Sequence, residues 1–218
     1  MKSGYTHITL VCDRSGSMSA VQSDAEGAVN QFITDQKAVE GTATFTLVEF
    51  DAPHGGLNDD WYHVVHDGDI QRTTIYALRP RGSTALLDAV GRAITETGEA
   101  LDKLADDAKP EHVIFVVQTD GQENSSREWT VEKVREVIKR QTDEWNWHFV
   151  FLGMGPDTFA QGHQMGFQNV TRSAQAGEAY AATYAVMDSA VAGLRTNSVK
   201  DLSETNVEVD EHGNVIPT

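Results

Sequence analysis

The sequence has little cysteine and no long apolar run. Cys12 is the only cysteine among 218 residues, so no disulfide can form within the chain, which fits a reducing compartment. No segment has the roughly 18 consecutive apolar residues of a membrane span, and the first apolar stretch is too short for a secretory signal peptide. We therefore expect a cytoplasmic protein without a membrane-spanning segment.

Basic residues are also scarce. The 17 lysines and arginines are outnumbered by 33 acidic residues, which gives a net charge of −16. Such a surface repels nucleic-acid phosphates and anionic lipids, so neither nucleic acid nor a membrane is expected as a partner. It favours cations and basic partners, although solubility alone would also explain it. The apolar fraction of 39% is that of a globular chain.

Several motifs of catalytic or nucleotide-binding proteins are missing. There is no phosphate-binding GxxxxGKS or GxxxxGKT loop and no GxSxG nucleophile motif. Gly153-Met154-Gly155 could begin a dinucleotide-binding turn, but Thr158 stands where the third glycine is required. These absences argue against a nucleotide-binding protein and against a serine hydrolase.

What the sequence does contain is an alternation of strand and helix patterns. Apolar, β-branched runs predict strands at 5–12, 43–50, 61–66, 113–117, 149–152 and 168–171. Apolar residues at helical spacing predict helices at 18–32, 85–101, 131–138, 158–165 and 179–194. The 61–66 strand follows a turn and could return as a hairpin partner. Such an alternation predicts an α/β fold, a Rossmann-like, doubly wound, mostly parallel sheet with helices on both faces.

The chain turns polar near its end. We expect one domain over residues 4–195 and a polar C-terminal extension over 196–218. Apolar residues at 207, 209, 215 and 216 flank a polar segment, which indicates either a small hairpin or a loose tail.

Oxygen-bearing side chains gather where strands are expected to end. Asp13, Ser15 and Ser17 follow the first strand, Thr84 precedes the second long helix, and Asp120 follows the 113–117 strand. In a parallel sheet, ligands bind at the carboxyl ends of the strands. Two carboxylates and three hydroxyls form a donor set suited to Mg²⁺ or Mn²⁺. The hydroxyls are neutral, so a bound cation would keep a strong attraction for an incoming carboxylate.

This set, Asp13-x-Ser15-x-Ser17 with Thr84 and Asp120, resembles the metal-ion-dependent adhesion site of von Willebrand factor type A domains. The resemblance covers about residues 5–194. It implies a doubly wound sheet with one antiparallel edge strand. It also implies that Ser15, Ser17 and Thr84 contact the metal directly, whereas Asp13 and Asp120 act mainly through water or in support.

The resemblance further implies a function. In that family a Glu or Asp of a partner protein completes the metal's coordination, so we expect a divalent-cation-dependent adhesion or assembly module and no enzyme. Intracellular members often work beside AAA+ ATPases or in stress-resistance assemblies.

Two other functions remain open. Asp13 could be the nucleophile of a metal-dependent phosphatase or phosphotransferase of the haloacid-dehalogenase type, but Ser15 stands where that chemistry needs a second aspartate. The chain could also be a structural subunit of a phage or multiprotein assembly, using the same site or its tail. No catalytic or organic-cofactor residue is predicted.

Several other polar residues are weaker candidates. Arg14 could help to select the partner or could be a solvated side chain. The three histidines at 54, 63 and 66 lack the spacing of a zinc site. The acidic residues Glu49, Asp51 and Glu123 are interpreted as charges on the rim of the site.

Overall fold

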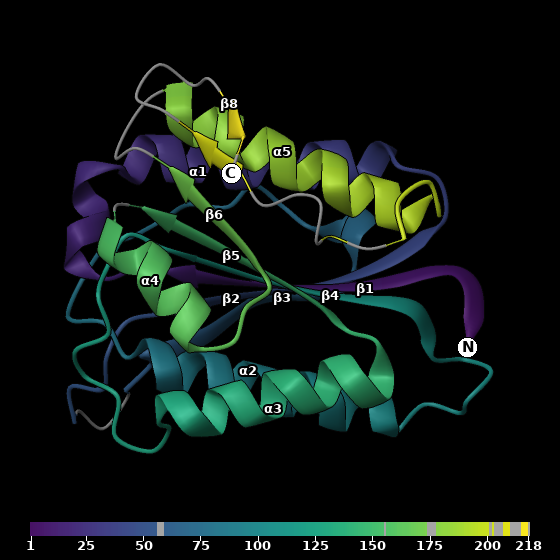
Figure 1. Cartoon of the computed structure of the whole chain (residues 1–218), viewed down its shortest axis with the longest axis horizontal. Coiled ribbons are helices and arrows are strands. Elements are labelled where there is room, and N and C mark those ends of the chain that lie inside the picture. The colour runs from purple at the N-terminus through teal and green to yellow at the C-terminus, as the bar shows by residue number, and fades with distance from the viewer. Residues whose placement is uncertain are drawn as a thin grey trace.

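The alternating strands and helices form one central sheet between two layers of helices (Figure 1). The computed structural model describes residues 1–55, 59–154, 156–173, 178–200, 202, 207–209 and 215–217. The strands lie in the order β3-β2-β1-β4-β5-β6-β7-β8. Their bounds are β1 Lys2–Asp13, β2 Thr42–Phe50, β3 Tyr62–Asp69, β4 Pro110–Thr119, β5 His148–Met154, β6 Asn169–Ser173, β7 Val207–Val209 and β8 Val215–Pro217.

The sheet is mostly parallel, as the sequence predicts. Strands β1, β2, β4, β5, β6 and β7 run parallel to one another, and β3 pairs antiparallel with β2 at one edge. The predicted Rossmann-like sheet with an antiparallel edge strand is confirmed. At the other edge β8 pairs antiparallel with β7, so the C-terminal segment adds a second short hairpin to the sheet.

Helices cover both faces of the sheet. The elements are η1 Gly16–Ala20, α1 Gln22–Ala38, η2 Ile70–Arg72, α2 Leu86–Asp102, α3 Val131–Trp145, α4 Pro156–Gln164 and α5 Glu178–Arg195. Helices α1 and α5 lie on one face and α2 and α3 on the other, while α4 packs against β5 and β6 (Figure 1). Within the described ranges no helix is long and apolar enough to cross a bilayer.

The first predicted helix is divided in the structure. The segment 16–20 is a 3₁₀ turn, and the α-helix starts only at Gln22. The backbone of Val21, with φ −124° and ψ 13°, separates the two. The tight turn keeps the residues that follow β1 close to the end of that strand, where the polar side chains gather.

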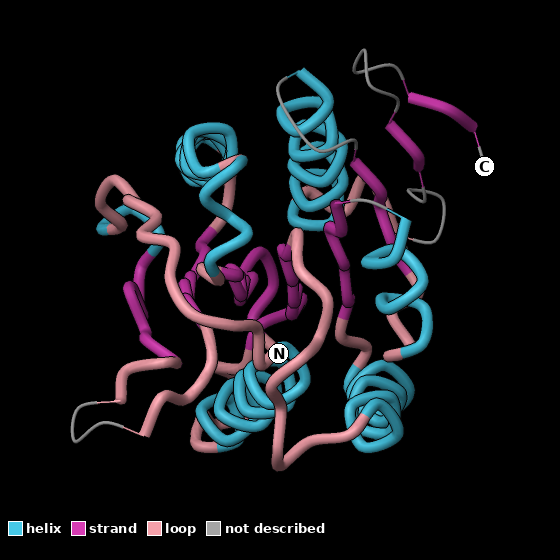
Figure 2. The backbone as a smooth tube through the Cα atoms, turned by 90° about the vertical axis from the view of Figure 1, so that its left-hand side faces the viewer, coloured by secondary structure: helices cyan, strands magenta, loops and turns pink. Residues whose placement is uncertain are grey.

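Each face of the sheet carries an apolar core. Residues of β1, β2 and β4 pack against α1 and α5 on one face, and residues of β4 and β5 pack against α2 and α3 on the other. The middle of β4, from Ile114 to Val117, is completely buried, as expected for a strand covered on both sides. This packing fixes where the carboxyl ends of the strands lie. Figure 2 looks onto that end, where the loops gather between the two helical layers.

Candidate metal centre

The site begins where two neighbouring strands end. Strands β1 and β4 are paired so that Cys12 lies opposite Gln118, which places Asp13 beside Thr119. The Asp13 side chain is completely buried. Its Oδ1 accepts a hydrogen bond from the backbone N–H of Ser15 at 2.6 Å, and its Oδ2 accepts one from the Thr119 hydroxyl at 2.5 Å. The carboxylate is therefore held rigidly below the loop.

Both serines of the loop join this arrangement. The hydroxyl oxygens of Ser15 and Ser17 are 3.0 Å apart, and Ser17 Oγ donates to Asp120 Oδ1 at 2.8 Å. Ser15 is buried, whereas Ser17 is exposed and Asp120 is partly exposed. The tight turn after β1 thus connects the end of β1 with the end of β4 through side-chain oxygens.

Thr84 reaches the same place from the loop that precedes α2. The backbone N–H of Gly16 donates to the carbonyl of Gly82 at 3.0 Å, which joins this loop to the turn after β1. The backbone N–H of Thr84 donates to Asn124 Oδ1 at 3.0 Å, which joins it to the loop after β4. Thr84 itself is only 2% exposed.

Gly121 shows how closely these oxygens converge. A Cβ atom built on Gly121 would lie 3.0 Å from Thr84 Oγ1, 3.3 Å from Asp13 Oδ2 and 3.4 Å from Ser17 Oγ. Three side-chain oxygens, two from the end of β1 and the turn after it and one from the loop before α2, therefore surround one small space beside the loop after β4, and Ser15 and Asp120 are hydrogen-bonded to Ser17. The structure brings together all five residues that the sequence singles out. Carboxylate and hydroxyl oxygens without nitrogen or sulfur fit a hard divalent cation.

The donor set differs from common zinc sites. In the described part of the chain, no three His, Cys, Asp or Glu side chains are grouped so that they could hold a metal ion. The set at the strand ends has only two carboxylates and completes its shell with hydroxyls. His54 and His66 instead have ring nitrogens 2.9 Å and 3.2 Å from the backbone carbonyls of Ala52 and Asp69.

Burial makes the two carboxyl groups costly to ionise. It raises the pKa of Asp13 to about 6, although hydrogen bonds from Thr119 and Ser15 oppose the shift and the charge of Asp120 adds to it. Burial also raises the pKa of Asp120, and the hydrogen bond from Ser17 opposes it. A cation at this place would favour both ionised forms.

A buried ion-pair cluster lies beside the site, and the sequence interpretation missed it. Arg14 is 5% exposed, and its guanidinium lies 3.0 Å from Glu49 Oε2 and 3.8 Å from Asp51 Oδ1. Arg81 contacts Asp51 and Asp60, each at 2.5 Å. The interpretation of Glu49 and Asp51 as rim charges is wrong, because both are buried and paired with arginines. Arg14 is likewise not a solvated side chain.

Two further acids hold the loop after β4 against α2. Asp88, in the first turn of α2, accepts hydrogen bonds from the backbone N–H groups of Arg127, Glu128 and Trp129 at 2.8–3.0 Å. Glu123 accepts from the backbone N–H groups at 87, 125 and 126, so its carboxylate organises the loop and is not merely a charge on the rim. These bonds fix the loop on which Asp120 and Gly121 lie.

No protein-family model matches the chain, and no curated protein matches it. Several solved structures are similar to it. The chain aligns with the pilus adhesin SpaC from Lactobacillus rhamnosus GG in an open conformation, with 15% identity and a TM-score of 0.63, over 89% of this chain and 30% of that one. It aligns with a von Willebrand factor type A protein from Catenulispora acidiphila, with 15% identity and a TM-score of 0.52, over 95% and 44%.

A third similar structure is proximal thread matrix protein 1 from the mussel byssus with a zinc-occupied MIDAS motif, that is, a metal-ion-dependent adhesion site. The identity is 16% and the TM-score 0.55, over 88% of this chain and 46% of that one. The chain thus spans less than half the length of each of these proteins. At this level of identity the likeness concerns the fold, and the fold is of the von Willebrand factor type A kind.

Proposed function

We propose that this chain is a divalent-cation-dependent protein-binding module that captures an Asp or Glu of a partner protein. The observation that carries the proposal is the convergence of oxygens from Asp13, Ser17 and Thr84 around the Cβ position of Gly121. Mg²⁺ or Mn²⁺ would be held by Asp13, Ser15, Ser17, Thr84 and Asp120. When bound, such a cation supplies a Lewis-acidic centre that attracts a carboxylate oxygen.

The hydroxyl and carboxylate side chains of the site would contribute in different ways to holding the cation and leaving it attractive to a partner carboxylate. The hydroxyls of Ser15, Ser17 and Thr84 offer neutral oxygens, which leave much of the positive charge uncompensated. Asp13 and Asp120 supply negative charge and fix the hydroxyls, since Asp13 accepts from the Ser15 backbone and Asp120 accepts from the Ser17 hydroxyl. The hydrogen bonds between the three loops hold this arrangement before any ligand arrives, which lowers the entropic cost of binding.

We also propose that the chain is not an enzyme. A phosphotransferase of this layout needs an acid or base near its nucleophile. The group two residues after Asp13 is Ser15, whose oxygen lies 3.0 Å from another hydroxyl and not beside a base. If Mg²⁺-dependent release of phosphate from p-nitrophenyl phosphate were observed and were lost in Asp13→Asn, the phosphatase alternative would replace this reading.

The cellular setting of the module and the kind of its partner are also part of the proposal. The described structures similar to this chain include a pilus adhesin and a byssus matrix protein, which supports protein partners. A single cysteine, itself buried, supports a cytoplasmic location. We propose a domain over residues 4–195 with an extension over 196–218, and a partner in an AAA+-linked or stress-resistance assembly, as the family resemblance implies.

The proposed site can be tested by direct metal binding. Titration of Mn²⁺, followed by electron paramagnetic resonance and competed with Mg²⁺, should show one site in the wild-type protein. Thr84→Ala should weaken it by about 10- to 100-fold, the range seen when groups that support a metal are removed. Thr95→Ala is the matched control, because Thr95 is exposed on α2 and its hydroxyl donates only to the carbonyl of Gly91. Equal affinity of Thr84→Ala and the wild type would contradict the proposal.

A further inference from the structure

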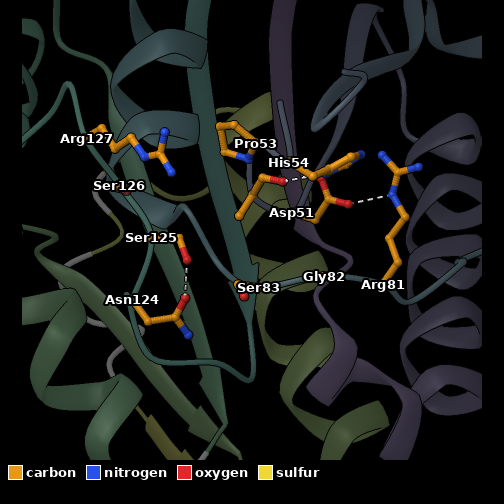
Figure 3. A pocket seen from close by; sticks show the side chains of 11 residues that line it. Asp51, Pro53, His54, Arg81, Gly82, Ser83, Asn124, Ser125, Ser126 and Arg127 are labelled. Atoms are coloured by element: carbon orange, nitrogen blue, oxygen red, sulfur yellow. Dashed lines mark hydrogen bonds and ion pairs between the residues drawn. The ribbon is translucent and has the colours of Figure 1, made fainter. Parts of the chain in front are cut away.

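A pocket of about 690 Å³ opens beside the candidate metal centre (Figure 3). Three loops form it: the loop after β2, the loop that leads into α2, and the loop after β4. Ser83 lies between the first and third of these loops, and Arg81 and Arg127 stand on opposite walls.

The pocket and the metal centre share a wall. Gly82 and Ser83 line the pocket and immediately precede Thr84 in the chain. Asn124 also lines it, and its Oδ1 accepts the hydrogen bond from the backbone N–H of Thr84. A peptide with a carboxylate at the metal centre would therefore extend a neighbouring residue over this pocket.

The two walls differ in whether their arginine is paired with carboxylates. Arg81 is paired with Asp51 and with Asp60, so its positive charge is already compensated. Arg127 on the other wall is exposed, and its side chain has no ion pair or hydrogen bond among the described residues. In Figure 3 its side chain extends from its loop toward the opposite wall. In a chain with a net charge of −16, this places an uncompensated cation in a pocket that adjoins two carboxylates.

Arg127 stands on a rigid support. Its backbone N–H donates to Asp88 Oδ2 at 2.8 Å, and the next two N–H groups donate to Asp88 Oδ1. The carboxylate of Asp88 is thus occupied by backbone donors, and it does not line the pocket. A guanidinium on a fixed backbone loses less entropy when it binds, and its planar donors suit a carboxylate.

We propose that this pocket binds a second acidic side chain of the partner, a Glu or Asp a few residues from the one at the metal. Arg127 would pair with it, and the exposed Ser83 hydroxyl would donate a further hydrogen bond. The inference rests on the proposed function and specifies it. The partner segment is an acidic peptide with two carboxylates at a fixed spacing, one recognised through the cation and one through Arg127.

The test uses a random peptide library displayed on phage, selected on the full chain in MgCl₂ and eluted with a chelator. We expect the recovered peptides to share two acidic positions. Replacing the second acid by its amide should lower the affinity for the wild type about tenfold, the effect of one charge-assisted hydrogen-bonded contact. For Arg127→Gln the same replacement should have no further effect. Arg140→Gln, an exposed arginine on α3 far from the pocket, should behave as the wild type.

The outcomes separate the two proposals. Peptides with one essential acid, bound equally by the wild type and Arg127→Gln, overturn the second-acid pocket and leave the metal-dependent site intact. If no peptide requires Mg²⁺, or if Thr84→Ala binds them as well as the wild type, the proposed function fails and this inference fails with it.

Discussion

At the scale of single residues, Gly121 is the position where adding a side chain should disturb the candidate site most. Its Cβ position is surrounded by oxygens of Thr84, Asp13 and Ser17 at 3.0–3.4 Å, so any side chain would occupy the space between them. Its backbone φ lies outside the left-handed region, so alanine can adopt the same conformation. The need for glycine is therefore one of space and not of backbone freedom.

Gly121→Ala should block the cation without unfolding the protein. We expect Mn²⁺ affinity to fall by about 10- to 100-fold, because the methyl group takes the place that the hydroxyl and carboxylate oxygens enclose. The thermal unfolding temperature in chelator should stay within a few degrees of the wild type. Metal titration and thermal unfolding of the same samples measure both effects.

Gly27→Ala is the control for this substitution. Gly27 lies inside α1, and a Cβ there would meet no atom within 4 Å. It should leave metal affinity unchanged and stabilise the helix by about 0.5–1 kcal/mol. An unchanged Mn²⁺ affinity in Gly121→Ala would mean that the cation does not lie among these oxygens.

The sequence predicts the members of the site better than their surroundings. Asp13, Thr84 and Asp120 could be found because oxygen-bearing residues follow strands or precede helices at recognisable spacing. The ion pairs of Arg14 with Glu49 and of Arg81 with Asp51 could not, since each joins residues 30 or more positions apart. The sequence pattern of an acid at the end of a strand is the same whether its side chain faces water or pairs with an arginine.

At the scale of elements, the strands and helices were predictable because β4 and β5 are continuous apolar runs and α2 has a strongly one-sided pattern. What the pattern does not show is how two helices pack on each other. In the structure Trp129, just before α3, lies on Gly91 of α2. A Cβ on Gly91 would approach atoms of the Trp129 ring to 2.0–2.5 Å. Glycine at this position therefore lets the loop before α3 lie close to α2.

Two glycines of the same helix should respond in opposite ways to alanine. Gly91→Ala should destabilise the protein by about 1–3 kcal/mol, because the tryptophan ring must leave its place. Gly98→Ala should stabilise it by about 0.5–1 kcal/mol, since its Cβ would find its nearest neighbour, Gln141 Nε2, at 3.6 Å. Denaturant unfolding of both variants measures the difference. Similar stability of the two would contradict the close packing of Trp129 on α2.

At the scale of the whole molecule, two buried groups give the fold opposite dependences on pH. Burial lowers the pKa of His7 from 6.5 to about 4, so the unfolded chain takes up the proton first and stability is lost as the pH falls from 6.5 to 4. Burial raises the pKa of Asp13 from 3.8 to about 6, so the folded chain retains a proton that the unfolded chain has released. Stability is then lost as the pH rises from 3.8 to about 6.

Asp13→Asn should separate these two effects. The amide can keep the local hydrogen bonds: its oxygen accepts from Ser15, and its nitrogen donates to the Thr119 hydroxyl, which can turn to the carbonyl of Gly121 at 3.2 Å. Without the buried charge, the variant in chelator should be more stable than the wild type at pH 7 by roughly 3 kcal/mol, because Asp13 ionises with a pKa of about 6 in the folded chain and 3.8 in the unfolded chain, and each tenfold difference in acidity corresponds to about 1.4 kcal/mol.

That difference should shrink as the pH falls from about 6 toward 3.8, because Asp13 of the folded wild type takes up its proton over this range while Asp13 of the unfolded chain still keeps its charge. The variant should then lose stability more steeply than the wild type as the pH falls, because the His7 contribution is no longer opposed. Urea unfolding from pH 4 to pH 7 measures both curves. Saturating Mg²⁺ should stabilise the wild type at pH 7 and have little effect on Asp13→Asn, since the cation compensates a carboxylate that the variant lacks. If the stability of the two proteins in chelator changed with pH in the same way, ionisation of Asp13 would not destabilise the folded protein. If Mg²⁺ stabilised both proteins equally, the cation would bind elsewhere.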